Sequence, residues 1–109
     1  MILTERDRLL VTDLSLSHAL TRDQVIQLGF FESVSRANSR LKSLRETGFL
    51  RRLATPYFTQ SIYSSGRLAA HIVDPCTARL LVNRAESPRF LQHALSVTNV
   101  RIALIQRGA

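Results

Sequence analysis

The chain has 109 residues, of which 15 are basic and 8 acidic, so its net charge is +7 and its isoelectric point lies near 11.3. Such a length predicts a single domain, and the absence of an apolar run of roughly 20 residues argues against a membrane protein. The lone cysteine, Cys76, excludes an internal disulfide, so we expect a cytoplasmic protein.

The first expected helix is marked by its N-terminal cap. Thr4 has a capping side chain, and the acidic residues that follow it suit the positive end of a helix dipole. We end this helix near Asp13 or Leu14, because segment 15–18 is polar and rich in serine. Its buried side is expected to hold Leu9, Leu10, Val11 and Leu14.

A second, shorter helix follows. The sequence Thr21-Arg22-Asp23-Gln24 is a capping box, in which the Thr21 hydroxyl and the Gln24 side chain satisfy each other's backbone N–H groups. We expect helix over residues 22–28, ended by Gly29. Phe30 and Phe31 are then expected to fill the core between this helix and the next.

The third expected helix holds most of the candidate functional residues; a serine (Ser33 or Ser35) caps it and Gly48 ends it. Its apolar residues recur at spacings of three and four, which predicts one buried stripe: Val34, Ala37, Leu41 and Leu44. The opposite surface consists of small polar or cationic residues: Ser35, Arg36, Ser39, Arg40, Lys42 and Ser43. Such a surface can approach a phosphate backbone closely and still offer hydrogen-bond donors to base edges.

A β-hairpin is expected after Gly48. Its first strand covers residues 49–53, a long turn-rich and aromatic wing follows, and residues 68–73 form the returning strand. The aromatic side chains of this segment, Tyr57, Phe58 and Tyr63, are expected to pack on the domain. A short helix, a glycine turn, a basic helix and a hairpin predict a mostly α fold with a small β-hairpin, a winged helix-turn-helix with additional C-terminal helices.

Two further helices each begin with a cap followed by proline. Asp74-Pro75 opens a short helix over residues 75–82, with Ala78, Leu81 and Val82 as its core residues. Ser87-Pro88 opens the last helix, from residue 88 to about 106, which has more apolar residues than one stripe needs. We therefore divide the domain into a winged-helix core with a short helix, residues 1–86, and a C-terminal helix, residues 87–109, that pairs two subunits into a homodimer.

The positive charge is concentrated in one part of the chain. Residues 33–73 contain seven basic residues and one acidic residue, so they hold six of the seven net charges. All the basic residues except Lys42 are arginines, whose guanidinium groups suit bidentate contact with phosphate and guanine. This concentration is typical of a surface that binds a polyanion, although a solvated basic face or an acidic protein partner remains the alternative.

Four segments resemble the replication-relaxation family, winged-helix proteins encoded largely on plasmids, phages and integrative elements of bacteria. They are LTERDRLLVTDL, ALTRDQVIQLGF, SRANSRLKSLRETGFLRRL and RFLQHALSVTNVRIAL, of which the last contains the most family-like piece, residues 93–104. Members of the family are often considerably longer than this chain. The resemblance implies a DNA-binding winged helix that serves the replication, transfer or gene control of a mobile element.

Catalytic and metal chemistry is poorly supported. The three histidines and Cys76 have no zinc-site spacing, and His93 is expected to be a packed or capping residue. The carboxylates are scattered and the chain has no glycine-rich phosphate loop. We therefore expect no enzymatic activity, no metal, no cofactor and no small-molecule ligand.

The predicted function is sequence-specific binding of double-stranded DNA by a transcriptional regulator or a replication or transfer factor, associated with the nucleoid when bound. Arg36 and Arg40 are the candidates for guanine or flanking phosphates, and Thr21 and Arg22 for a phosphate at the second helix. The remaining candidates are Ser35, Ser39, Lys42, Ser43 and Arg45 on the third helix and Arg51, Arg52 and Arg67 on the hairpin. The alternative is a winged-helix module that docks an acidic protein.

Overall fold

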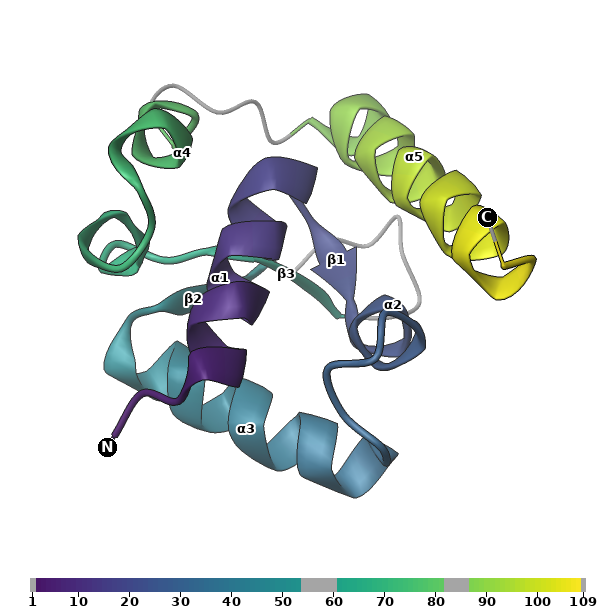
Figure 1. The fold of residues 1–109 in the computed structure, drawn as a ribbon. Coiled ribbons are helices and arrows are strands. Elements are labelled where there is room, and N and C mark those ends of the chain that lie inside the picture. The colour runs from purple at the N-terminus through teal and green to yellow at the C-terminus, as the bar shows by residue number, and fades with distance from the viewer. Residues whose placement is uncertain (1, 54–60, 82–86, 109) are drawn as a thin grey trace.

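The computed structural model describes residues 2–53, 61–81 and 87–108. Most of these residues are helical, and a three-stranded antiparallel sheet with the order β1-β3-β2 completes the fold. The elements are, in chain order, α1 (Glu5–Ser17), β1 (Leu20–Thr21), α2 (Arg22–Gln27), α3 (Val34–Thr47), β2 (Leu50–Leu53), β3 (Ile62–Ser65), the 3-10 helix η1 (Ala69–His71), α4 (Pro75–Arg79) and α5 (Pro88–Gln106). This winged-helix-like arrangement confirms the predicted fold class (Figure 1).

The predicted caps begin the helices as expected. Thr4 and Thr21 each form a complete capping box, with Asp7 and Gln24 as the respective partners. Ser33, not Ser35, caps α3, and Gly48 ends that helix with a left-handed φ of 96°. Helix α5 begins at Pro88 and ends at Gln106, as predicted.

Helix α1 is longer than predicted and runs on to Ser17. Its serines are compatible with helix because they find partners there: Ser15 Oγ donates to the Val11 carbonyl at 2.8 Å, and Ser17 Oγ donates to the Asp13 carboxylate at 2.8 Å. Leu9, expected to be buried, is 55% exposed because it lies on the outer side of the helix.

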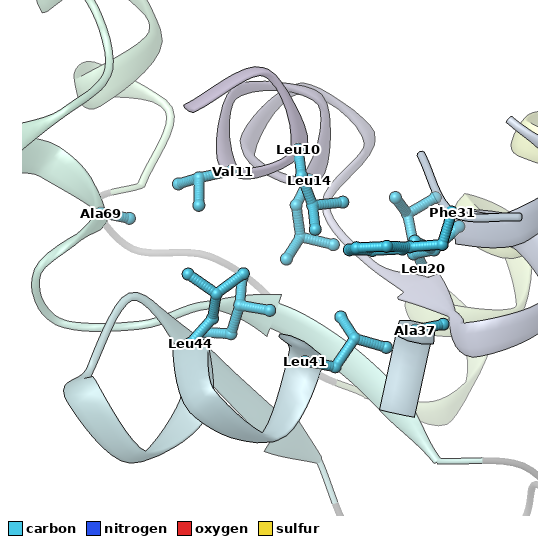
Figure 2. Close-up of a cluster of buried hydrophobic side chains, with 11 residues drawn as sticks. Leu10, Val11, Leu14, Leu20, Phe31, Ala37, Leu41, Leu44 and Ala69 are labelled. Carbon is cyan, nitrogen blue, oxygen red and sulfur yellow. The ribbon is translucent and has the colours of Figure 1, made fainter. Parts of the chain in front are cut away.

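The core lies between α1 and α3. Leu10 and Leu14 point from α1 toward Leu41 and Leu44 of α3, with the Phe31 ring beside them (Figure 2). Phe30 is only partly buried against this cluster. Val34 is a wrong prediction: it is 48% exposed, because the first turn of α3 extends away from α1 (Figure 1).

The hairpin differs from the prediction. The returning strand is Ile62–Ser65, paired with β2 on one side and with the unpredicted two-residue strand β1 on the other. Residues 68–73 are not a strand, because the chain turns at Gly66 and continues into η1. At that turn the backbones touch: the Gly66 N–H donates to the Phe49 carbonyl at 2.9 Å, and a Cβ at Gly66 would overlap the Gly48 carbonyl.

Helix α4 and the aromatic residues of the hairpin differ in how well they match the prediction. Helix α4 ends at Arg79, and its buried residue is Thr77, whereas Ala78 and Leu81 are partly buried. Tyr63 packs partly buried against the core, as expected. Tyr57, Phe58 and Val82 lie outside the described residues.

Helix α5 buries one face and leaves another exposed. Its buried residues are Leu91, Ala94, Leu95, Thr98 and Ile102. It is fixed to α2 by Gln24, whose Nε2 donates to the Leu95 carbonyl at 3.0 Å and to Asn99 Oδ1 at 2.9 Å. The sequence predicts that this helix is buried on two sides. Within a single chain, only one of its sides is buried.

Candidate nucleic-acid interface

The outward face of α3 forms an edge of the molecule, at the bottom of Figure 1. Of the six polar residues predicted there, Ser35, Arg36, Ser39 and Lys42 are exposed, while Arg40 and Ser43 are partly buried. Three leucine or alanine side chains hold the inner face of the same helix in the core: Ala37, Leu41 and Leu44 are fully buried. A surface of serine hydroxyls and cationic side chains is thus presented by a helix whose position is fixed.

Arg40 already has a partner within the chain. Its Nε donates to Asp7 Oδ1 at 2.9 Å, and its Nη2 contacts Asp7 Oδ2 and donates to the Ile2 carbonyl at 2.9 Å. Asp7 is 1% exposed, so this bidentate pair links the first turn of α1 to the middle of α3. The sequence predicts that Arg40 contacts DNA, but in the structure most of its donors are engaged with Asp7 and Ile2.

The ion pair changes the acidity of both groups. Burial of Asp7 acts to raise its pKa, but the hydrogen bonds from Arg40 and Thr4 and the charge of Arg40 outweigh that effect and lower the pKa below its ordinary value of 3.8. The hydrogen bonds to Asp7 and the charge of that carboxylate raise the pKa of Arg40 above its ordinary value, although burial acts in the opposite direction. Asp7 is therefore a carboxylate at neutral pH, and it neutralises one arginine of the basic surface.

On the α2 side of α3, Arg22 lies next to an exposed asparagine. Arg22 Nη1 donates to Asn38 Oδ1 at 3.4 Å, and Arg22 Nη2 contacts Asp23 Oδ1 at 3.3 Å. The Thr21 hydroxyl accepts from the Gln24 N–H, so it serves the cap. Asn38 follows the buried Ala37 in the sequence, but it is itself exposed and bonded to a residue of the neighbouring helix. Its amide has the donor and acceptor pair that suits adenine.

The C-terminal end of α3 adds further cations. Lys42 lies 4.0 Å from Glu46, an exposed pair of little energetic weight, and Arg45 is partly buried in the last turn. Arg51 and Arg52 are both exposed on β2, but consecutive strand residues point to opposite faces. Arg67 lies at the base of the hairpin, close to Gly48. Its Nε is 3.6 Å from the position that a Cβ at Gly48 would occupy.

The other candidate residues do not form a site within the described part of the chain. No three of the described His, Cys, Asp and Glu residues come together to hold a metal ion. His93 is exposed on α5, so the expectation of a packed or capping histidine is wrong, and Cys76 is exposed. None of the described helices has both the length and the apolar character needed to cross a bilayer.

Comparison with known proteins gives one match. Neither a curated protein nor a solved structure matches the chain. The family model described as replication-relaxation matches residues 11–109, from the middle of α1 through α5. The chain therefore belongs to the replication-relaxation family, which indicates a role in the replication or transfer of plasmids and other mobile elements.

Proposed function

We propose that the protein binds double-stranded DNA in a sequence-specific manner, with α3 in the major groove, as a transcriptional regulator or a replication or transfer factor of a mobile element. The observation that supports this proposal most directly is the outward face of α3. Its exposed residues are small donors and cations, including Ser35, Ser39 and Lys42. Helix α3 itself lies at the lower edge of the ribbon in Figure 1. The major groove admits an α-helix, and small outward side chains let the helix backbone approach the base edges closely.

The contacts divide according to where the residues lie. Ser35, Asn38 and Ser39 occupy the exposed face or its α2 side and are assigned to base edges or to the phosphates next to them. Lys42, Arg45, Arg67 and whichever of Arg51 and Arg52 lies on the α3 side of β2 are assigned to phosphates, as is Arg22 beside α2. Arg40 is reassigned as a positioning residue, because its pairing with Asp7 fixes the angle between α1 and α3.

We further propose that α5 pairs two copies of the chain. Its exposed apolar residues Val97, Val100 and Leu104 are spaced by three and four, the spacing of a coiled-coil seam, and α5 has no acidic residue. Helix α5 lies at the upper right of Figure 1, away from α3 at the bottom. Two recognition helices held in this way would suit a DNA site with two half-sites.

This is a binding function in the cytoplasm, at the nucleoid when DNA is bound, with no catalytic step, cofactor or small-molecule ligand. The competing function, a module that docks an acidic protein, uses the same positive charge. It gives no reason for the small outward side chains of α3, whereas in the major groove they let the helix backbone approach the base edges.

A salt titration separates the two functions. Binding of the full chain to a labelled random duplex of about two helical turns is followed by fluorescence anisotropy as salt is raised. With about five phosphate contacts, the logarithm of the affinity should fall against the logarithm of salt with a slope of about −4 to −5. Absence of binding at low salt would overturn the proposal and favour the acidic protein partner.

A further inference from the structure

A groove of about 430 Å³ runs between the first turn of α1 and one side of α3. The α1 side contributes Thr4, Arg6 and Asp7, and the α3 side contributes Ser35, Arg36 and Ser39 among others. This is the flank of α3 opposite to the one where Asn38 meets Arg22 of α2. The groove therefore adjoins the proposed recognition face along its α1 side.

The groove has an excess of positive charge once its ion pair is counted. Asp7 is its one carboxylate, and Arg40 neutralises it through the bidentate contact. Two cations remain, Arg6 and Arg36, and within the described residues neither is ion-paired. Glu32 lines the adjoining hollow beside both arginines, but it too forms no salt bridge with them in the described part of the chain.

Arg6 is held in place at the edge of this groove. Its guanidinium lies 5.4 Å from the centre of the Phe31 ring, and its Nη1 donates to the Phe30 carbonyl at 3.5 Å. Phe31 is 5% exposed and belongs to the main core, so the platform beneath the guanidinium is rigid. A guanidinium fixed in this way loses less freedom when it binds an anion, which favours binding.

Chemically, the groove suits a tetrahedral phosphate. Two guanidinium groups supply paired N–H donors, and the Ser35 and Ser39 hydroxyls add single donors. Because a helix in the major groove has one DNA strand along each of its sides, a backbone phosphate of the strand on the α1 side would reach this place.

We propose that Arg6 and Arg36 together bind one backbone phosphate of the DNA strand that borders α3 on the side of α1. This inference rests on the proposed function and adds to it a residue of α1 and a contact outside the helix-turn-helix. Arg40 and Asp7 then act beneath the site by holding α1 and α3 at a fixed separation, while Arg22 serves the strand on the other side.

The test compares two substitutions on the same helix. Arg6→Gln removes the charge but keeps most of the side-chain stem on Phe31, and Arg8→Gln removes an exposed arginine that does not line the groove. The two variants lose the same net charge, so any general electrostatic effect is shared. Thermal unfolding of both variants checks that the fold is intact, and Arg6→Lys serves as a second variant that keeps the charge.

On a random duplex, Arg6→Gln should weaken binding about five- to tenfold near 0.1 M salt and reduce the salt slope by about one, while Arg8→Gln changes affinity less than about twofold. Arg36→Gln should behave like Arg6→Gln, and the double variant should lose less than the product of the two single effects, because both residues serve one phosphate. Arg6→Lys should retain part of the affinity.

Two results would count against the inference in different ways. If the wild-type chain binds the duplex and Arg6→Gln matches Arg8→Gln in affinity and slope, the phosphate site is wrong and the proposed function stands. If the wild-type chain does not bind the duplex, both are wrong. Inorganic phosphate at moderate concentration gives a further comparison. If it weakens duplex binding by the wild type until the difference from Arg6→Gln disappears, the result supports the site and shows that the site also binds the free anion.

Discussion

The two longest helices, α3 and α5, lie on different sides of the molecule (Figure 1). Their buried faces are similar in composition, but their exposed faces differ. Each buries one leucine-containing stripe against the domain. The outward face of α3 has serines and cations, whereas that of α5 has Val97, Val100 and Leu104, each at least half exposed. The inner stripes therefore account for the fold, and the outer faces account for the two proposed partners, DNA and a second copy of the chain.

Substitutions in the buried stripes of α3 and α5 should lower the free energy of unfolding most. The loss should be larger for α3 than for α5. Leu41 of α3 is fully buried in the larger hydrophobic cluster, whereas Leu91 of α5 is 3% exposed in a smaller one. Leu41→Ala should lower the free energy of unfolding by about 3–4 kcal/mol and Leu91→Ala by about 2 kcal/mol. Urea unfolding measures both, and an equal or reversed loss would contradict the view that α3 is the more firmly anchored helix.

The next effect concerns the pair that links α3 to α1. Asp7→Asn removes the carboxylate but leaves Arg40, which is 28% exposed at its side chain, so the loss should be about 2 kcal/mol, below that for a wholly buried pair. Glu32→Gln, an exposed control on the segment before α3, should change the free energy of unfolding by less than about 0.5 kcal/mol.

The same pair gives a signed pH dependence. Because the folded pKa of Asp7 is lowered below 3.8, its contribution to stability is complete above that value and is lost as pH falls through the folded pKa. The difference in unfolding free energy between wild type and Asp7→Asn should therefore shrink between about pH 5 and pH 2. A difference that stays constant over this range would show that the carboxylate charge is not what stabilises the fold.

Much of this architecture follows from local sequence signals, and the errors have physical causes. Caps such as Thr21 and Ser87 act within one helical turn, so they identify helix starts without knowledge of the fold. The Arg40–Asp7 pair joins residues 33 positions apart, and β1 exists only because β3 returns beside it, so neither has a local signal. The contact between Asn38 and Arg22 has no local signal either, because a helical wheel does not reveal that α2 lies beside α3.

A charged substitution on the outward face of α5 should hardly change the free energy of unfolding but should strongly weaken dimer formation. Val97→Glu is expected to change the free energy of unfolding by less than about 0.5 kcal/mol, since the side chain is 55% exposed, and to convert the dimer to monomer. Leu9→Glu, an equally exposed site on α1, is the matched control and should leave the mass unchanged. Sedimentation equilibrium measures the mass, and a monomeric wild type would refute the pairing through α5.

The central claim, that the outward face of α3 contacts DNA, is tested most directly by placing a negative charge in its middle. Ser39→Glu introduces that charge on α3, and Gln92→Glu introduces the same charge at an exposed position of α5. Both variants should unfold at the same temperature as the wild type, but Ser39→Glu should bind a random duplex more than about tenfold more weakly while Gln92→Glu binds within about twofold of wild type. Equal affinities for the two variants would contradict the account.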